Sequence, residues 1–167
     1  MPSIHLTSRR RRPERRGATL VEMAVTLPVF AVFLAGLLEL NHAYMAVTTL
    51  QAATRQAARM GATGEMTTDE VETATRDILG STFQPAYVEI LIKDASAFDS
   101  DPEGGFDIDA LPAIDLATAE PRTLFVVRAE VDYSDISMVA PFFVKGTDEN
   151  GNDTAARLSA QSVMRHE

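Results

Sequence analysis

The sequence predicts an α+β protein in which one long N-terminal helix, membrane-spanning in its first half, packs with its second half on a small antiparallel sheet. Three observations predict this class. An uncharged apolar run follows a cluster of arginines, helical spacing of apolar residues continues beyond that run, and the later part of the chain changes to alternating apolar and polar residues. A helix followed by antiparallel strands forms a layered fold in which the inner face of the sheet packs on the helix.

The first predicted element is a basic leader followed by the apolar run. Six arginines lie within residues 1–17, and the chain is uncharged from Met23 to Leu38. Ala18 to Leu38 comprises 21 residues, which make about 31 Å of helix at about 1.5 Å per residue. The hydrocarbon core of a bilayer is about 30 Å thick. We therefore expect a leader at residues 1–17 and a single transmembrane helix at residues 18–40.

The distribution of charge predicts the orientation of this helix. Residues 1–17 carry six arginines and one glutamate, a net charge of +5, whereas residues 18–167 carry nine basic and 23 acidic residues, a net charge of −14. Because basic segments stay on the cytoplasmic side, we expect a cytoplasmic N-terminus and an extracytoplasmic domain at residues 41–167. The acidic exterior would repel phosphates, so nucleic acid is not an expected partner. The chain has no cysteine, so no disulfide framework is expected.

The unusual residue of the apolar run is Glu22. A carboxylate within a span costs about 2 to 3 kcal/mol on insertion scales, so it needs a reason to be there. Gly17, four residues and then Glu22 at the head of an apolar helix resemble the type III signal of type IV pilin-like proteins. The run from Arg15 to Pro28, R-R-G-A-T-L-V-E-M-A-V-T-L-P, is most similar to the TadE-like proteins. These are minor pseudopilins of the tight-adherence (Tad, or Flp) pilus assembly system, and the similarity is specific over residues 15–61.

The resemblance implies how the chain is processed and with what it assembles. A prepilin peptidase would cut between Gly17 and Ala18 on the cytoplasmic side, leaving a mature chain of 150 residues, 167 minus 17, with Glu22 at its fifth position. Other pilin-like subunits and Tad membrane components would be its partners, in the bacterial inner membrane. The function implied is that of a structural component of pilus biogenesis or a related secretion apparatus.

Two interpretations of Glu22 stay open at this stage. After the cut, the carboxylate of one subunit could pair with the Ala18 ammonium of a neighbour, which would offset the cost of burial and set the axial register of packed helices. Alternatively, Glu22 reaches the headgroups from the first turn of an ordinary anchor. A separate alternative for the whole chain is an uncleaved single-pass membrane protein whose external domain binds a ligand or a partner.

The helical pattern continues beyond the apolar run. From Asn41 to Ala62 the sequence is rich in alanine and free of proline, and apolar residues recur at helical spacing. We expect one helix from about Leu20 to Met60, ended by Gly61 and Gly64. Its second half either packs on the sheet or forms a coiled-coil stalk.

A second helix and several strands follow. Thr67 and Glu70 have the spacing of a capping box, and Gly80 ends the helix that they begin. Alternating residues predict strands at residues 88–92, 125–133 and 156–164, with a less regular candidate at residues 139–145 that is weakened by its proline. Asn150 and Gly151 predict a turn before the last strand.

Catalytic motifs are scarce. The sequence has no glycine-rich phosphate loop, serine elbow or cysteine nucleophile, so we expect a protein that is not an enzyme and needs no cofactor. The histidines His5, His42 and His166 are far apart in sequence, and we expect them at the surface or at the membrane interface.

The only metal-like feature is an acidic loop at residues 94–121. Asp99, Asp101, Glu103 and Asp107 have part of the spacing of a calcium loop. The pattern then fails, because Ala110 occupies the position of the bidentate glutamate. Weak calcium binding and a solvated acidic loop both stay open.

Overall fold

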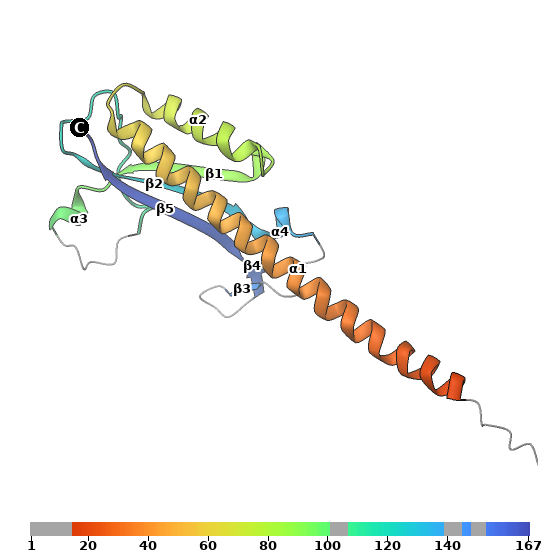
Figure 1. Cartoon of the computed structure of the whole chain (residues 1–167). Helices are drawn as coiled ribbons and strands as arrows, with labels where there is room; N and C mark the ends of the chain where they lie inside the picture. Colours follow the sequence, from red (N-terminus) through yellow and green to blue (C-terminus); the bar gives the residue numbers. More distant parts are fainter. Residues whose placement is uncertain (1–14, 101–106, 139–144, 148–152) are drawn as a thin grey trace, which may run out of the picture. The chain divides into compact units, whose positions relative to one another are not determined.

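The computed structural model describes residues 15–100, 107–138, 145–147 and 153–167 (Figure 1). The chain divides into two compact units, unit 1 ending at Leu37 and unit 2 comprising Leu38–Glu167. A single helix, α1 (Arg15–Ala62), contributes residues to both units. It starts and ends within a few residues of the predicted long helix.

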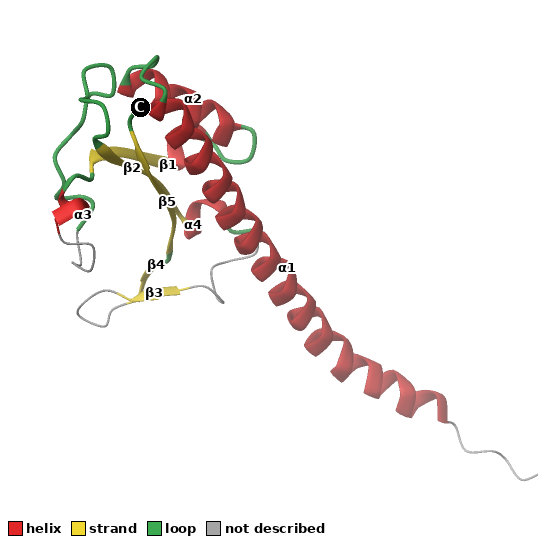
Figure 2. Ribbon diagram, turned by 60° about the vertical axis from the view of Figure 1, so that its left-hand side comes forward, coloured by secondary structure: helices red, strands yellow, loops and turns green. Residues whose placement is uncertain are grey.

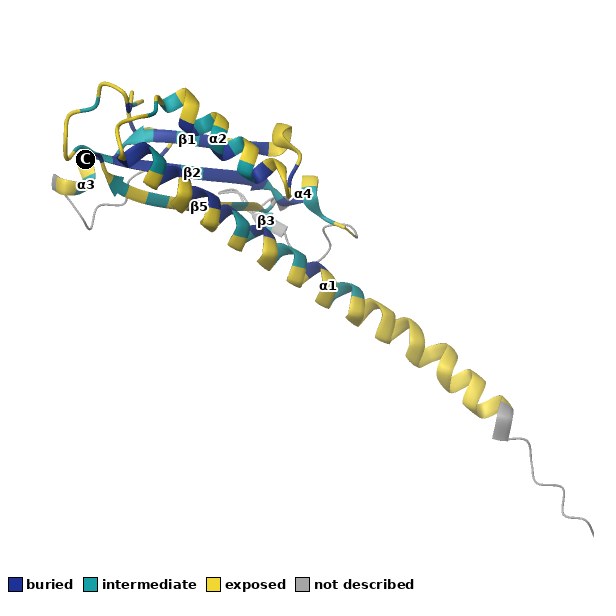
Figure 3. Ribbon diagram, turned by 45° about the horizontal axis from the view of Figure 1, so that its top comes forward, coloured by how far each residue is buried: buried dark blue, intermediate teal, exposed yellow. Residues whose placement is uncertain are grey.

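The part of α1 in unit 1 exposes its apolar side chains. From Gly17 to Leu34 every residue is exposed, including Val25 and Phe30, and Figure 3 shows this exposure along the helix. Pro28 lies inside the helix without ending it. Proline lacks the N–H that bonds one turn back, a defect that membrane helices tolerate better than helices in water. A surface this apolar is typical of a helix in lipid.

The main sheet of unit 2 has three antiparallel strands in the order β1-β2-β5. They are β1 (Val88–Asp94), β2 (Leu124–Asp132) and β5 (Arg157–Arg165). Ile90 pairs with Ala129, which pairs with Ala160. These strands confirm the three alternating segments predicted from the sequence, and the hydrophobic alternation fixes which face of each strand turns inward.

Two helices cover one face of this sheet (Figure 2). They are the second half of α1 and α2 (Thr68–Gly80). Leu50, Ala53 and Ala57 of α1 are buried in one cluster with Val71 of α2 and Val127 of β2. Because alanine side chains are small, the helix lies close to the sheet. The second half of α1 therefore packs on the sheet, and the coiled-coil alternative is wrong for this part of the helix.

The end of α1 differs slightly from the prediction. The helix continues through Gly61 to Ala62, so Gly61 does not end it. An added Cβ at Gly61 would lie 2.9 Å from Leu116 Cδ1 and 3.2 Å from the Phe125 ring, so glycine is needed there for close packing. Gly64, with a φ of +68°, supplies the left-handed turn that follows.

The predicted capping box at the start of α2 is confirmed. The Thr67 hydroxyl accepts a hydrogen bond from the Glu70 backbone N–H at 3.3 Å, and the Glu70 carboxylate accepts one from the Thr67 N–H at 2.8 Å. The Thr67 N–H first, and then the Thr67 hydroxyl, which lies 3.1 Å from Glu70 Oε2 and donates to it, hold the pKa of Glu70 below its ordinary value. The two residues satisfy N–H groups that the first turn of a helix leaves without partners.

The other face of β2 is less solvated than the alternation suggested. Its Glu130 is buried at 4% exposure and forms ion pairs with Arg128 and with Arg157, the latter at 3.3 Å. Further along the strand, Val126 packs in a small cluster with Ala95, Ile108 and Leu111. Both faces of the central strand are therefore covered.

Several short elements lie outside the predicted pattern. They are η1 (Pro85–Tyr87), α3 (Ala97–Ser100), α4 (Tyr133–Ile136) and a second sheet of β3 (Lys145–Thr147) and β4 (Asp153–Ala155). The predicted strand at 125–133 is one residue too long, because β2 ends at Asp132 and Tyr133 begins α4. Most of the candidate strand at 139–145 and the predicted turn at Asn150 and Gly151 lie outside the described residues.

Candidate functional site

The predicted processing residues lie near the start of α1. Gly17, Ala18 and Glu22 are all exposed, and an added Cβ at Gly17 would meet nothing within 4 Å. Gly17 and Ala18 are helical and fall within the first turn of a helix that starts at Arg15. Because the first four N–H groups of a helix have no intrahelical partner, unwinding this turn to an extended backbone breaks only the bonds that its carbonyls accept.

The carboxylate of Glu22 has no partner among the described residues. The Thr26 hydroxyl bonds to the Glu22 backbone carbonyl at 3.0 Å, not to its side chain. A carboxylate on an exposed apolar helix is therefore available to a cation of another molecule. Its roles in processing and assembly, like those of Gly17 and Ala18, stay predictions.

A second carboxylate, Glu39, is buried, whereas Glu22 is exposed. It belongs to unit 2, is 0% exposed, and accepts a hydrogen bond from the Tyr133 hydroxyl at 2.5 Å through its Oε1. Tyr133 is equally buried, and its hydroxyl also lies 3.3 Å from the Glu39 carbonyl oxygen. Burial first, and then the hydrogen bond and charge of Glu39, raise the pKa of Tyr133. Oε2 of Glu39 has no partner among the described residues.

A further hydrogen bond attaches α4, the short helix that begins at Tyr133, to α1. His42 is half-buried, and its Nε2 donates to the Ile136 carbonyl at 3.0 Å. We call these four residues, Glu39, His42, Tyr133 and Ile136, the α4 clasp. It ties α4 to the first turns of α1 within unit 2. The expected placement of His42 at the membrane interface stays a prediction.

Sequence reasoning missed Glu39. The available signal was a second carboxylate at the far end of the apolar run, 17 positions after Glu22 (39 minus 22). Its partner could not be read from the sequence, because Tyr133 is 94 residues away and looked like the last position of a strand.

The expected surface position of His166 is wrong. It is buried at 8% exposure, because its backbone N–H and carbonyl bond to Thr123 and Arg122 and so extend the sheet past β5. The ring lies under the turn at Gly64, where an added Cβ would meet the ring Cε1 at 3.0 Å. His5 lies outside the described residues.

The calcium candidates are not assembled in the described part of the chain. Asp99 pairs with Arg165 at 2.7 Å, and the Asp107 carboxylate accepts the Asp109 N–H at 3.0 Å. Asp101 and Glu103 lie outside the described residues. Within the described ranges, no group of three or more His, Asp or Glu residues has the arrangement of a metal site.

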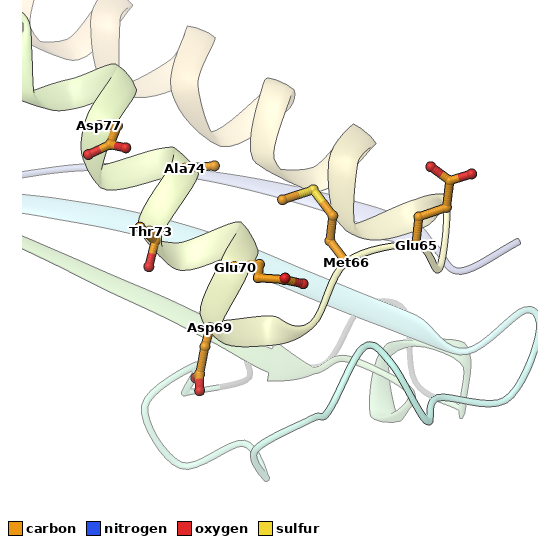
Figure 4. A pocket seen from close by; sticks show the side chains of 7 residues that line it. All are labelled: Glu65, Met66, Asp69, Glu70, Thr73, Ala74 and Asp77. Atoms are coloured by element: carbon orange, nitrogen blue, oxygen red, sulfur yellow. The ribbon is translucent and has the colours of Figure 1, made fainter.

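An acidic groove of about 440 Å³ runs along the exposed side of α2 (Figure 4). It is lined by Glu65, Met66, Asp69, Glu70, Thr73, Ala74 and Asp77. The Glu70 carboxylate is already used by the capping box. The lining has four carboxylates and no histidine, cysteine or cationic side chain.

The comparison with protein families agrees with the signal at the N-terminus. The family model described as TadE-like protein matches residues 17–59, which include Gly17, Glu22, Glu39 and His42. This segment is TadE-like. The predicted resemblance is therefore confirmed over residues 17–59, which lie within α1. Searches of the curated proteins and of the solved structures give no match.

The TadE-like segment lies within the helix that is suited to a bilayer. Within the described ranges, α1 is the one helix long and apolar enough to cross a membrane, and its most apolar stretch is fully exposed. Together these features point to a single-pass membrane protein. In unit 2 the same segment contains the α1 half of the α4 clasp.

Proposed function

We propose that this chain is a minor pseudopilin-like structural component of Tad pilus biogenesis or of a related secretion apparatus. It is inserted in the bacterial inner membrane with its N-terminus in the cytoplasm, and a prepilin peptidase cuts it after Gly17. The observation that carries the proposal is the TadE-like match over residues 17–59, on a helix whose first half exposes mostly apolar side chains around Glu22.

The cut would change the chemistry of the helix start. Hydrolysis of the peptide bond between Gly17 and Ala18 leaves a carboxylate on Gly17 and an ammonium on Ala18, and it removes the six arginines of the leader. The new ammonium lies about one helical turn from Glu22. In an assembly, the ammonium of one subunit can pair with Glu22 of the next, which supports a fixed axial register between helices packed in lipid.

The role of the chain itself is structural, and the catalyst in this process is the peptidase. Unit 2 would be presented outside the membrane, with its sheet held on the second half of α1 by the shared core. A protein that organises an assembly needs such a rigid attachment. The helix can position the domain only if the sheet does not move along the helix.

The proposal is tested by intact-mass analysis of protein extracted from membranes. We expect a mature chain that begins at Ala18 in the wild type and an uncut chain in Gly17→Val. Gly36→Val is the matched control, since it makes the same change in the same helix outside the predicted cut, and it should be processed normally. A wild-type chain that keeps the mass of the form starting at Met1 would overturn the processing role.

The second candidate is an uncleaved single-pass protein whose external domain binds a partner. The open acidic groove along α2 favours it, since a basic segment would complement the groove's carboxylates. The same mass measurement separates the two candidates, because only the second leaves the leader attached.

A further inference from the structure

The exposed side chains of α1 change from apolar to polar within unit 2. Leu38, Leu40, Tyr44 and Met45 are between 55% and 70% exposed. From Thr48 onward the exposed positions of the same helix are polar apart from Ala52, and they include Arg55 and Arg59. Apart from Asn41, which is also exposed, the boundary between an apolar and a polar exposed surface thus falls between Met45 and Thr48, beyond the end of the predicted span at residue 40.

A hydrogen bond holds another exposed apolar residue, from a distant part of the chain, close to this stretch of α1. Met138 follows α4 and is 72% exposed. The α4 clasp places it, because Ile136, two residues earlier, accepts the hydrogen bond from His42. We call Leu38, Leu40, Tyr44, Met45 and Met138 the juxtamembrane patch, and all five belong to unit 2.

The length of the patch along α1 matches the headgroup layer. Ala18 to Leu38 already provides about 31 Å of helix for a core about 30 Å thick. From Leu38 to Met45 the helix rises about 10 Å more. The polar layer on each side of a bilayer is about 5 to 8 Å thick, and apolar faces of interfacial helices lie about 5 to 10 Å deep. By chain connectivity alone, residues 38–45 emerge through this layer.

The composition of the patch also fits lipid. It contains no charged residue, and Tyr44 has the aromatic ring and polar tip that are enriched at membrane interfaces. The one carboxylate at this level, Glu39, points into unit 2 and is covered by Tyr133, so lipid does not meet it. Without that cover the carboxylate would face the interface at a cost that such residues normally avoid.

We propose that the juxtamembrane patch seats unit 2 directly in the headgroup layer, with a lipid surface as its occupant. Tyr44 and Met138 lie among the headgroups, and the α4 clasp both places Met138 there and keeps Glu39 out of the lipid. The external domain is thus held against the membrane by side chains on two separate elements. This inference rests on the membrane insertion contained in the proposed function, but not on cleavage or assembly.

The test uses the absence of tryptophan from this chain. Single variants Tyr44→Trp and Met138→Trp of the full chain are reconstituted in phosphatidylcholine vesicles with or without acyl-chain-brominated lipid, which quenches nearby indole fluorescence. Val25→Trp, in the apolar run, is the positive control. Val163→Trp is the negative control, because it is also an exposed apolar position, at 41%. Val163 pairs with Val126 of β2, which lies seven residues before Tyr133 along the chain. This separation is about 23 Å along an extended strand, so Val163 is far from the α4 clasp.

We expect Val25→Trp to be quenched most strongly, Tyr44→Trp and Met138→Trp to be quenched and blue-shifted relative to Val163→Trp, and Val163→Trp to be unaffected. If Val25→Trp is quenched but Met138→Trp is not, the helix spans the bilayer but the juxtamembrane patch does not contact lipid, and the proposal is overturned. Blue-shifted but unquenched Met138→Trp means that protein, such as a second copy, covers the patch, which also overturns it. If Val25→Trp is not quenched, α1 does not span the bilayer, and both the transmembrane helix and the lipid contact of the patch are overturned.

Discussion

The two carboxylates that flank the apolar run of α1 have opposite surroundings. Glu22 is exposed, and its side chain has no partner among the described residues, whereas Glu39 is fully buried and bonded to Tyr133. Both sit on one helix, and both need compensation for leaving water. Unit 2 supplies the partner of Glu39 from its own fold, whereas no described residue pairs with the side chain of Glu22. The comparison separates a residue whose partner the fold supplies from one for which we propose a role in assembly.

The largest effect is expected from Glu22→Ala. If the carboxylate pairs with a neighbour's Ala18 ammonium, the variant should insert at least as well as the wild type, since about 2 to 3 kcal/mol of insertion cost is removed. It should nevertheless lose cross-linking to other pilin-like subunits and fail to support piliation, because the register-setting pair is gone. Cross-linking in membranes and counts of piliated cells measure this.

Thr26→Ala provides a control on the same helix, since Thr26 bonds only to the Glu22 backbone. It should assemble normally. If Glu22→Ala retains wild-type cross-linking and piliation at normal protein level, Glu22 serves only to reach the headgroups, and the assembly mechanism is abandoned while the anchor stays.

A smaller effect, confined to the stability of unit 2, is expected from Tyr133→Phe. The change leaves the buried Glu39 carboxylate without its hydrogen-bond donor, which costs about 1 to 3 kcal/mol of unfolding free energy. The urea midpoint of the full chain in detergent, followed by circular dichroism, should fall. Tyr44→Phe removes the same hydroxyl from a 70% exposed position and should leave the midpoint unchanged. Equal midpoints in the two variants would mean that the clasp does not stabilise the fold.

The same tyrosine gives a pH dependence with a definite sign. Since its pKa is raised in the folded state, the stabilisation is fully present below the ordinary tyrosine pKa of about 10. It is lost as the pH rises above that value, because the unfolded chain then ionises more readily. Tyr133→Phe should therefore be less sensitive to alkaline pH than the wild type. A steeper alkaline loss in the variant would contradict the buried, neutral hydroxyl.

The contrast between the two glutamates also shows what the sequence could and could not predict. The long helix, the capping box and the three main strands are local patterns, and periodicity found them within a few residues. Glu22 was found because its significance lies in its distance from Gly17. Glu39 was missed because its significance lies in a contact with Tyr133, and an alternating pattern cannot reveal that β2 stops at Asp132 and turns into α4. His166 was misplaced for the same reason, since backbone bonds to Arg122 and Thr123 bury it.

The smallest effect concerns a third carboxylate, Glu70, which has a partner but stays in water. Its pKa is lowered by the Thr67 N–H and then by the Thr67 hydroxyl, so it stabilises the fold above the ordinary glutamate pKa of about 4.3. That stabilisation is lost as the pH falls through the lower, folded value. Glu70→Gln keeps a capping-box acceptor but cannot titrate, so the urea midpoint should depend less on pH as the pH falls below about 4.3. Glu65→Gln removes a neighbouring exposed carboxylate of the same groove and should keep the wild-type slope. If the urea midpoints of both variants depend equally on pH, the Glu70 carboxylate stabilises the fold no more than an exposed carboxylate does. A partner would then matter for a glutamate only where the pair is buried, as with Glu39.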